Sequence, residues 1–162
     1  MKVIPATGAN ALSVAEYVIA SAMLLLRGAY QSTPAVAAGQ WPRNALSNGR
    51  ETAGKTLGLI GFGSIGQLSA RLAQALGMSV IAYDAMMDAD HPAFATSGVR
   101  AAGLDEVIAT SDVVSLHVPL VDSTRDLFNA ARIASMKKGA VLINTARGGI
   151  VDEGALAAAL RS

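Results

Sequence analysis

The sequence contains no cysteine, and only 15% of its 162 residues are charged. The absence of cysteine excludes disulfides and thiolate metal sites and fits a reducing compartment. With 13 basic and 12 acidic residues scattered along the chain, the formal net charge is +1, which leaves no basic patch for nucleic acid. Asp88, Asp90 and His91 lie in a polar stretch without a further ligand, so we expect a solvated loop there. We predict neither a nucleic-acid partner nor a metal.

Long hydrophobic runs are also missing. The longest, over residues 17–26, contains Ser21 and is shorter than the stretch of about 20 residues that spans a bilayer. At the beginning of the sequence, Pro5, Thr7 and Asn10 interrupt any apolar segment that could act as a secretory signal. We therefore expect a soluble, cytoplasmic protein with no membrane partner.

Small aliphatic residues are abundant, and hydrophobic residues make up 52% of the chain. This composition is typical of parallel strands that helices cover on both faces. The apolar pattern predicts strands near residues 57–61, 79–84, 113–118 and 140–145, a short strand near Val99, and helices near residues 65–76, 104–110, 129–136 and 154–160. Because strands and helices alternate, the fold class is α/β, with a doubly wound parallel sheet of the Rossmann type.

The strand that the helix near residues 154–160 should lead into is not in the sequence. Nucleotide-binding sheets of this type usually have about six strands, and an open sheet edge is a feature that proteins avoid. We therefore expect that the domain is truncated before its last strand, and that the chain is part of a longer polypeptide.

The first 50 residues have a different character. Ser13 and Glu16 form a capping-box pattern, which predicts a helix that begins at Ser13 and ends near Arg27. This helix is apolar nearly all round, so its own domain or a second subunit must cover it. Prolines and glycines then mark a connecting arm. We divide the chain into this helix and arm, residues 1–50, and an incomplete dinucleotide-binding domain, residues 51–162.

A glycine motif connects the first strand of that domain to its helix. Gly61 permits a tight turn, Gly63 lets the backbone approach a pyrophosphate, and Gly66 allows the helix to pack closely on the strand. Phosphates would then face a helix N-terminus, where free N–H groups and the helix dipole favour an anion. The motif alone is weak, but its position between a strand and a helix predicts a dinucleotide site.

Asp84 closes the second strand, close to the expected separation of about 20 residues from the motif. A carboxylate there accepts hydrogen bonds from ribose hydroxyls and repels a 2′-phosphate, so NAD is favoured over NADP. A methyltransferase site is the nearest competitor, because it also combines a glycine loop with an acid after the second strand. The intact third glycine favours the dinucleotide.

Loops that follow the later strands carry further candidates, because ligands of such sheets bind outside the carboxyl ends of the strands. One loop contains His117, Val118 and Pro119. In the other, Arg147 precedes a pair of glycines; its guanidinium could bind a carboxylate with two parallel hydrogen bonds and stabilise charge on a carbonyl oxygen. A surface arginine in an ion pair explains the spacing equally well.

Together these motifs resemble a known family. Residues 54–66, the His117–Leu120 run with Thr124, and the run from Asn144 to Asp152 are similar to the D-isomer-specific 2-hydroxyacid dehydrogenases, most of all to the phosphoglycerate dehydrogenase-like branch. The segments 10–16 and 39–41 resemble the helix and arm that precede the nucleotide domain in that family. The resemblance implies an NAD-dependent oxidoreductase that transfers a hydride between nicotinamide and a D-2-hydroxy acid or 2-oxo acid.

The resemblance also implies roles for individual residues. Arg147 would be the catalytic residue that holds the substrate carboxylate. The cofactor-binding residues would be Gly61, Gly63 and Gly66 of the turn, Ser64 and Ile65 at the pyrophosphate, Asp84 at the ribose, Val118 and Pro119 on the adenine side, Thr145 and Ala146 on the nicotinamide side, and also His117, Thr124 and Arg147. The helix from Ser13 to Arg27 would form the interface of a homodimer.

One departure from the family is plain. Its enzymes use a glutamate and a proton-transferring histidine several tens of residues after Arg147, and neither is in this sequence. His117 belongs to the cofactor loop and is not expected to replace that histidine. An alternative function therefore stays open: a non-catalytic NAD-binding sensor or corepressor-like module.

Overall fold

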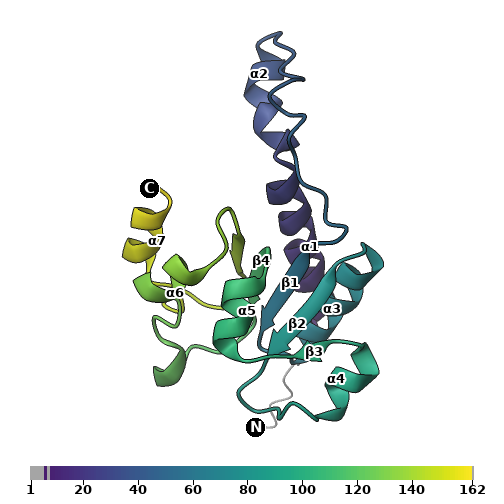
Figure 1. Ribbon diagram of the computed structural model, residues 1–162, viewed down its shortest axis with the longest axis vertical. Coiled ribbons are helices and arrows are strands. Elements are labelled where there is room, and N and C mark those ends of the chain that lie inside the picture. Colours follow the sequence, from purple (N-terminus) through teal and green to yellow (C-terminus); the bar gives the residue numbers. More distant parts are fainter. Residues whose placement is uncertain (1–5, 7, 162) are drawn as a thin grey trace.

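A parallel sheet of five strands in the order β3-β2-β1-β4-β5 forms the centre of the computed structural model, which describes residue 6 and residues 8–161 (Figure 1). The strands are β1 (Thr56–Ile60), β2 (Ser79–Tyr83), β3 (Arg100–Ala101), β4 (Val113–Leu116) and β5 (Val141–Asn144). The order reverses next to β1, where α/β sheets of this kind bind their ligands. The predicted α/β doubly wound fold is confirmed.

Helices cover both faces of the sheet. On one face lie α1 (Ala11–Arg27), α3 (Ser64–Ala75) and α4 (Pro92–Ser97), and on the other lie α5 (Leu104–Thr110), α6 (Ala130–Ser135) and α7 (Glu153–Ala159). The remaining short helices are η1 (Ala29–Ser32), α2 (Thr33–Ala37) and η2 (Asp122–Thr124). The predicted strands and sheet-covering helices all occur, with ends that shift by a few residues.

The alternation of side chains along β1 builds a core on each face. Leu57 and Leu59 are fully buried in the cluster that contains α1 and α3, whereas Ile60 is buried in the cluster that contains α5. Successive side chains of a strand point to opposite faces, so both faces of this central strand are apolar. That arrangement agrees with the composition of the chain.

The predicted capping box at Ser13 is wrong. The helix α1 begins at Ala11, Asn10 is its N-cap, and no side chain caps it. Ala11 and Ala15 are buried, so tertiary packing extends the helix beyond the point that the local pattern suggested. Ser13 lies within the first turn instead of preceding it.

The solvated loop expected around His91 is partly helical. The ring Nδ1 of His91 accepts a hydrogen bond of 3.2 Å from the N–H of Ala93 and so caps α4. Phe94, one residue further, is buried. Sequence reasoning missed this helix because it is short and is anchored by a single aromatic side chain.

Residues 28–49 form an arm that projects from the end of α1, away from the sheet, with α2 near its tip (Figure 1). The arm returns to its starting point, because the N–H of Arg50 donates a 3.0 Å hydrogen bond to the carbonyl of Leu26. Trp41 on the arm is 80% exposed. The division of the chain at residue 50 stays a prediction.

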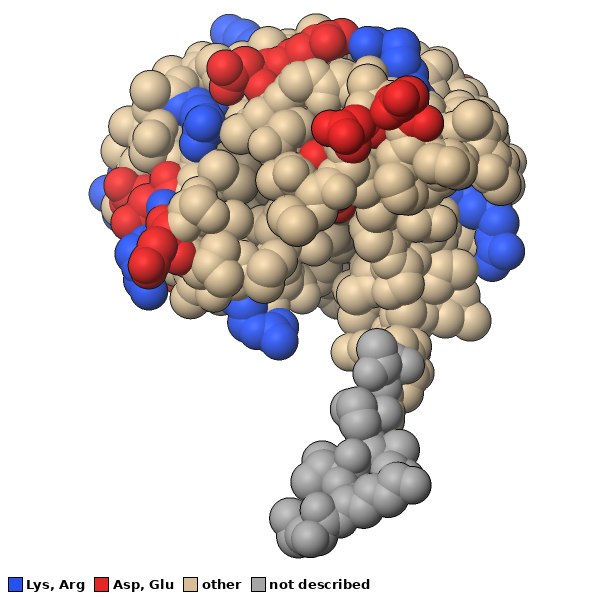
Figure 2. Space-filling view, turned by 90° about the horizontal axis from the view of Figure 1, so that it is seen from below, with Lys and Arg blue, Asp and Glu red and all other residues tan. Residues whose placement is uncertain are grey.

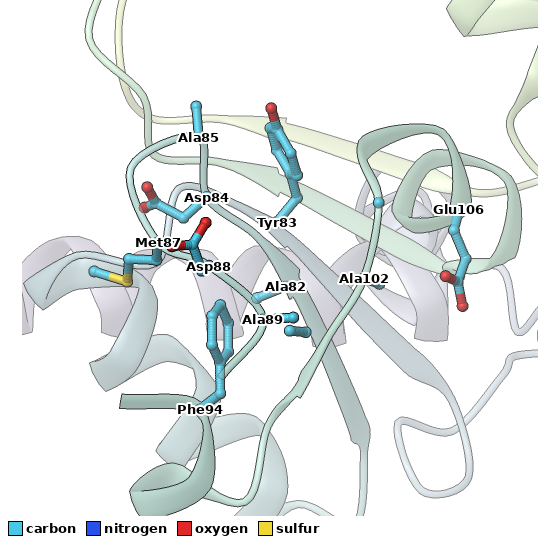
Figure 3. A pocket seen from close by; sticks show the side chains of 12 residues that line it. Ala82, Tyr83, Asp84, Ala85, Met87, Asp88, Ala89, Phe94, Ala102 and Glu106 are labelled. Atoms are coloured by element: carbon cyan, nitrogen blue, oxygen red, sulfur yellow. The ribbon is translucent and has the colours of Figure 1, made fainter. Parts of the chain in front are cut away.

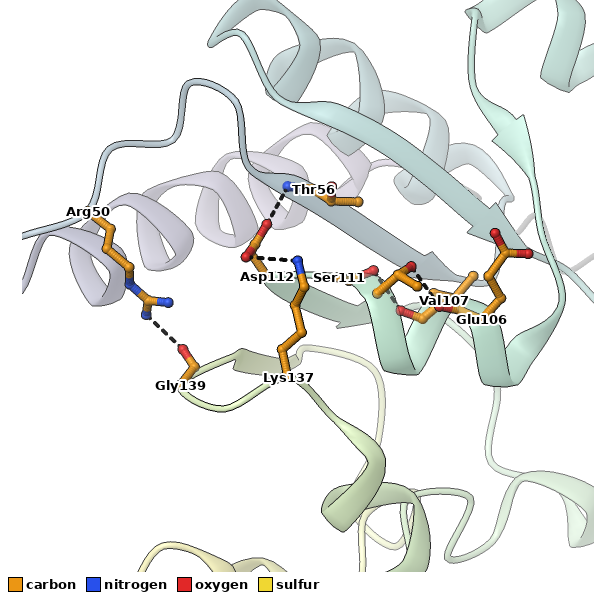
Figure 4. A network of polar contacts seen from close by, with 9 residues as sticks. Arg50, Thr56, Glu106, Val107, Ser111, Asp112, Lys137 and Gly139 are labelled. Carbon is orange, nitrogen blue, oxygen red and sulfur yellow. Dashed lines mark hydrogen bonds and ion pairs between the residues drawn. The ribbon is translucent and has the colours of Figure 1, made fainter.

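A polar network joins the amino ends of three strands (Figure 4). The carboxylate of Asp112, just before β4, accepts hydrogen bonds from the N–H of Thr56 at 2.8 Å and from Nζ of Lys137 at 3.2 Å. Burial raises the pKa of Asp112, but these hydrogen bonds and the charges of Lys137 and Lys55 outweigh it, so the pKa lies below its usual value. Nearby, Arg50 donates to the carbonyl of Gly139 at 2.7 Å.

Within the described residues, no helix is both long and apolar enough to cross a membrane. Residues 1–5, which bear on the predicted lack of a secretory signal, lie outside the described part of the chain.

Candidate functional site

The glycine loop between β1 and α3 is shaped by two close backbone approaches. Gly61 has φ +96°, and a Cβ there would lie 2.6 Å from the carbonyl oxygen of His117. A Cβ on Gly66 would lie 2.5 Å from the carbonyl oxygen of Gly61. Only glycine fits either position without displacing backbone. The loop therefore sits directly against the end of β4.

Phe62 anchors this loop from within. Its N–H donates a 2.7 Å hydrogen bond to Oδ2 of Asp84, its carbonyl accepts a 2.9 Å hydrogen bond from Nε2 of Gln67, and its ring is fully buried. The ring stacks on Phe94 of α4, with centroids 4.9 Å apart. Because Phe62 is held on three sides, the loop is preorganised. Sequence reasoning missed Gln67 and Phe94, whose roles depend on contacts distant in sequence.

Free N–H groups mark the N-terminus of α3. Gly63 is the N-cap and offers no side chain to cap the helix. In the described part of the chain, the N–H groups of Ser64, Ile65 and Gly66 have no hydrogen-bond partner. A Cβ on Gly63 would meet no atom within 4 Å, so the space above the turn is open. Free donors at a helix N-terminus favour an anion such as a pyrophosphate.

One cavity flanking the loop lies at the carboxyl ends of β2 and β3, and we call it the β2–β3 cavity (Figure 3). It measures about 500 Å³ and is lined by Ala82, Tyr83, Asp84, Ala85, Met87, Asp88, Ala89, Phe94, Ala101, Ala102, Gly103 and Glu106. Its charged lining residues are all acids. Asp84 also accepts a 2.8 Å hydrogen bond from the N–H of Met86 at Oδ1, and a carboxylate has lone pairs left for further donors.

A second cavity lies at the carboxyl ends of β4 and β5, and we call it the β4–β5 cavity. It measures about 540 Å³ and is lined by Asn10, Val14, Ile65, His117, Val118, Pro119, Leu120, Thr145, Ala146 and Arg147. Cavities of this size commonly hold small ligands. Arg147 is the only permanently charged residue in this lining, so the cavity is suited to an anion.

The guanidinium of Arg147 is free for a ligand. It makes no ion pair with any described residue; its one hydrogen bond runs from Nη1 to the carbonyl of Ala146, at 2.7 Å. The ion-paired surface arginine considered from the sequence is therefore not what is observed. The neighbouring Thr145 hydroxyl also lacks a hydrogen-bond partner among the described residues.

His117 is neutral at physiological pH. Burial lowers its pKa from 6.5 to about 4. Its ring Nε2 lies 3.0 Å from Oγ of the fully buried Ser115, and the backbone N–H of residue 117 donates a 2.7 Å hydrogen bond to the carbonyl of Ile60. A neutral imidazole that is fastened in this way lines the cavity but carries no charge to attract phosphates.

The predicted site residues are distributed as follows. Val118 and Pro119, expected on the adenine side, lie in the same cavity as Thr145 and Arg147, whereas Asp84 lies in the other. Thr124 lines neither: its hydroxyl donates to the carbonyl of Pro119 at 2.6 Å and accepts from the N–H of Val121 at 2.9 Å, which closes the loop after β4. The structure brings the remaining residues to one edge of the sheet, and their individual roles stay predictions.

Seen from the side to which β1 and β2 point, uncharged surface occupies the middle of this edge and charged side chains lie around it (Figure 2). Among the described residues, no group of three or more side chains of the metal-binding types comes together. The geometry is that of an elongated site with donors at its centre, acids at one end and a lone cation at the other.

Comparison with known proteins gives a consistent result. Residues 19–162 match the family profile described as D-isomer specific 2-hydroxyacid dehydrogenase, NAD binding domain. The chain is 57% identical over 159 residues to an (S)-sulfolactate dehydrogenase of Chromohalobacter salexigens, and the aligned region covers 98% of this chain and 51% of that protein. It is 45% identical over 152 residues to a D-3-phosphoglycerate dehydrogenase of Haemophilus influenzae, and this alignment covers 94% of this chain and 36% of that protein.

Among solved structures, a D-lactate dehydrogenase from Aquifex aeolicus in complex with NAD and lactic acid superimposes with a TM-score of 0.85 at 36% identity, over 98% of this chain and 46% of that one. The chain thus spans about half, or less, of the length of these relatives. The predicted family, fold class and cofactor are confirmed. The chain belongs to the D-isomer-specific 2-hydroxyacid dehydrogenase family, whose NAD-binding domain it contains.

Proposed function

We propose that the protein that carries this chain transfers a hydride between NAD and C2 of a D-2-hydroxy acid or 2-oxo acid. One observation carries the proposal. In the β4–β5 cavity, which adjoins the glycine loop through Ile65, the guanidinium of Arg147 is the only permanent charge and has no carboxylate partner among the described residues. Such a group is suited to the carboxylate that every 2-hydroxy acid carries.

The residues at the sheet edge fit the cofactor. When bound, NAD supplies a nicotinamide ring that accepts or donates the hydride. The free N–H groups of Ser64 and Ile65 would hold its pyrophosphate, and Asp84 would accept from a ribose hydroxyl. Thr145, whose hydroxyl lacks a partner in the described structure, would hydrogen-bond on the nicotinamide side.

Arg147 would hold the substrate. A guanidinium binds a carboxylate with two parallel hydrogen bonds and so fixes its orientation as well as its position. From the same place, it stabilises negative charge that builds on the C2 oxygen during reduction. The proton moves separately. In our proposal, the histidine that the family resemblance implies, which is not among these 162 residues, donates the proton to the C2 oxygen during reduction and accepts it during oxidation. His117, with a pKa of about 4, is unsuited to that task near neutral pH.

Selectivity for NAD over NADP is supported by the charge of the β2–β3 cavity. Asp84, Asp88 and Glu106 line it, and no cation does. Glu106 is ion-paired with Arg100 at 2.8 Å, so Asp84 and Asp88 are the acids that would repel a 2′-phosphate. The variant Asp84→Asn keeps one side-chain oxygen, for the N–H of Phe62, and loses the acceptor for the N–H of Met86. Because it also removes the negative charge, it should reduce the ratio of the affinity for NAD to the affinity for NADP. Equal affinity of the unaltered protein for the two cofactors would contradict this assignment.

The test of the proposed function combines binding with turnover. Calorimetry should detect NADH binding, and a panel that begins with (S)-sulfolactate and 3-phosphoglycerate, the substrate types named for relatives, should reveal NADH formation by absorbance. Arg147→Ala should lower kcat/KM by about 2–4 kcal/mol in transition-state stabilisation. Arg71→Ala, an exposed arginine outside the β4–β5 cavity, is the matched control and should leave kcat/KM unchanged.

The outcomes separate the two functional classes. NADH binding with turnover that depends on Arg147 supports the dehydrogenase. NADH binding without turnover on any 2-hydroxy acid favours the NAD-binding sensor. If turnover is unchanged in Arg147→Ala, Arg147 does not bind the substrate and is an ordinary surface arginine.

We also propose a homodimer formed through α1 and the arm. Leu12, Tyr17, Met23, Leu24 and Leu25 of α1 and Val36 and Trp41 of the arm are large apolar side chains that the described structure leaves exposed. Exposed apolar surface of this extent marks interaction sites. Leu24→Glu should convert a dimer into a monomer in light scattering, whereas Leu160→Glu, at an exposed leucine on the opposite side of the sheet, should not.

The cytoplasm is the location we propose. The cysteine-free sequence fits a reducing compartment. Fractionation of cells that express the tagged protein would test this, and recovery in an oxidising compartment would contradict it.

A further inference from the structure

Asn144, the last residue of β5, occupies an unusual position with respect to Arg147. Its Oδ1 accepts a 3.1 Å hydrogen bond from the N–H of Ala146, and its Nδ2 donates a 2.8 Å hydrogen bond to the carbonyl of Arg147. One carboxamide thus grips both sides of the loop that presents the guanidinium. One partner is a donor and the other an acceptor, so the carboxamide satisfies both with two separate atoms, which a carboxylate could not do.

The loop has little else to hold it. Among the described residues, no other hydrogen bond joins the backbone of residues 145–148 to the rest of the protein. On the far side, the carbonyl of Gly149 accepts a 2.9 Å hydrogen bond from the N–H of Asp126, and that of Ile150 accepts a 3.0 Å hydrogen bond from Phe128. Backbone hydrogen bonds to the rest of the protein therefore stop at the end of β5 and begin again at Gly149.

Arg147 stands in the middle of this gap and is followed by Gly148 and Gly149, the latter with φ +79°. Glycine restricts the backbone least of all residues, so the chain after Arg147 does little to define its direction. A displacement of about 1 Å in a substrate-positioning group can lower the rate by about 100-fold. The precision that Arg147 needs must come from the side that Asn144 controls.

We propose that Asn144 is a positioning residue, which fixes the guanidinium of Arg147 for the substrate carboxylate by bridging the loop backbone. This inference rests on the proposed function, because it assigns the carboxylate-binding role to Arg147. Asn144 does not line the β4–β5 cavity; it acts through the loop and not through the ligand.

The proposal distinguishes between substitutions at residue 144. Asn144→Ala removes both hydrogen bonds. Asn144→Asp keeps the acceptor for Ala146 but sets a carboxylate oxygen against the carbonyl of Arg147 and offers the guanidinium an ion-pair partner close by. Both variants should raise KM for the 2-oxo acid and lower kcat/KM by about 10- to 100-fold, with the affinity for NADH within about twofold of the unaltered protein.

Asn129→Ala is the matched control. Asn129 is also an exposed asparagine whose Oδ1 accepts a 3.1 Å hydrogen bond from a backbone N–H, that of Arg132, at the start of α6. It lines neither the β2–β3 cavity nor the β4–β5 cavity. A general loss of stability would affect both variants, whereas a loss of carboxylate binding should follow only Asn144→Ala.

A double-mutant cycle tests whether Asn144 acts through Arg147. The four proteins are the unaltered one, Asn144→Ala, Arg147→Ala and the double variant, all measured in the protein that carries this chain. The first readout is kcat/KM. The second, independent of turnover, is the binding of oxamate, an unreactive 2-oxo acid analogue, to the NADH complex, followed by NADH fluorescence.

If Asn144 works through Arg147, Asn144→Ala weakens oxamate binding in the unaltered protein but changes neither readout once Arg147 is alanine. Equal losses in both backgrounds, or equal losses for Asn144→Ala and Asn129→Ala, would overturn this inference and leave the proposed function intact. Absence of both turnover and oxamate binding in the unaltered protein would overturn the proposed function, and this inference with it.

Discussion

Protonation of His117 offers a direct test of how tightly the loops after β1 and β4 close over each other. Burial lowers the pKa of this imidazole from 6.5 to about 4. The unfolded chain therefore binds a proton on this residue at a higher pH than the folded protein does. In the window between these values, the stability of the folded state rises with pH and falls as the solution is acidified.

The size of the effect follows from the shift. Because a tenfold change in proton affinity corresponds to about 1.4 kcal/mol, His117 should remove up to about 3 kcal/mol of stability between a pH above 6.5 and a pH below 4. Between pH 7.5 and pH 5.0, the loss from this group is about 2 kcal/mol. Exposure of part of the ring to solvent makes these values upper estimates.

The assay is NMR of the imidazole Cε1–H resonances as a function of pH, with His117→Gln identifying the resonance. Urea unfolding at pH 7.5 and pH 5.0 supplies the second measurement, in which His117→Gln should reduce the acid-induced loss of stability. The matched control is His91→Gln, which removes the other histidine of the chain and should leave the titration of the His117 resonance unchanged. A His117 resonance that titrates near 6.5 would refute the reasoning, because the ring would then be open to water in solution.

Further predictions concern the glycine loop and the packing around it. Gly63→Ala should leave stability unchanged, since its Cβ meets no atom within 4 Å, yet weaken NADH binding in calorimetry; Gly66→Ala should lower the unfolding free energy by about 1–3 kcal/mol because its Cβ would lie 2.5 Å from a carbonyl oxygen. Equal effects of the two would contradict the predicted pyrophosphate approach. Asp112→Asn should lower the free energy of unfolding in urea at pH 7 by about 1–2 kcal/mol. It should also reduce the loss of stability on acidification, because a carboxyl with a depressed pKa stabilises the fold above its unfolded pKa and loses this effect as the pH falls through the folded value. An unchanged loss of stability in acid would contradict this prediction. Phe94→Ala should cost about 3–5 kcal/mol in thermal or urea unfolding by removing the ring stacked on Phe62, and a loss below 1 kcal/mol would show that the stack does not anchor the loop.

Local chemistry explains what sequence reasoning found. Gly61 has φ +96° and Gly66 packs against the carbonyl of Gly61, so part of the need for glycine arises within the turn and the spacing is visible in the sequence. The approach of Gly61 to the carbonyl of His117 depends on the tertiary structure. The alternation of strands and helices follows from the hydrophobic periodicity, which local segments carry by themselves. The family resemblance supplied the roles of the individual site residues, and all of these roles stay predictions.

One of the two hydrogen bonds of Asn144 could have been predicted from the sequence. An asparagine at a strand end, two residues before the N–H it bonds, is a common side-chain-to-backbone turn. The pattern was present in the sequence, but the second hydrogen bond, to the carbonyl of Arg147, depends on the course of the loop.

The sequence by itself determined the order of elements, the sheet type, the glycine turn and the carboxylate after β2, because each depends on residues close together along the chain. Only the tertiary structure decided that α1 begins before Ser13, that His117 is neutral, that Phe94 holds the glycine loop and that Arg147 stands alone in its cavity. Burial, stacking and the presence or absence of a counter-charge depend on which segments, distant in sequence, come into contact. Hydrophobic periodicity is a local property and does not specify these contacts.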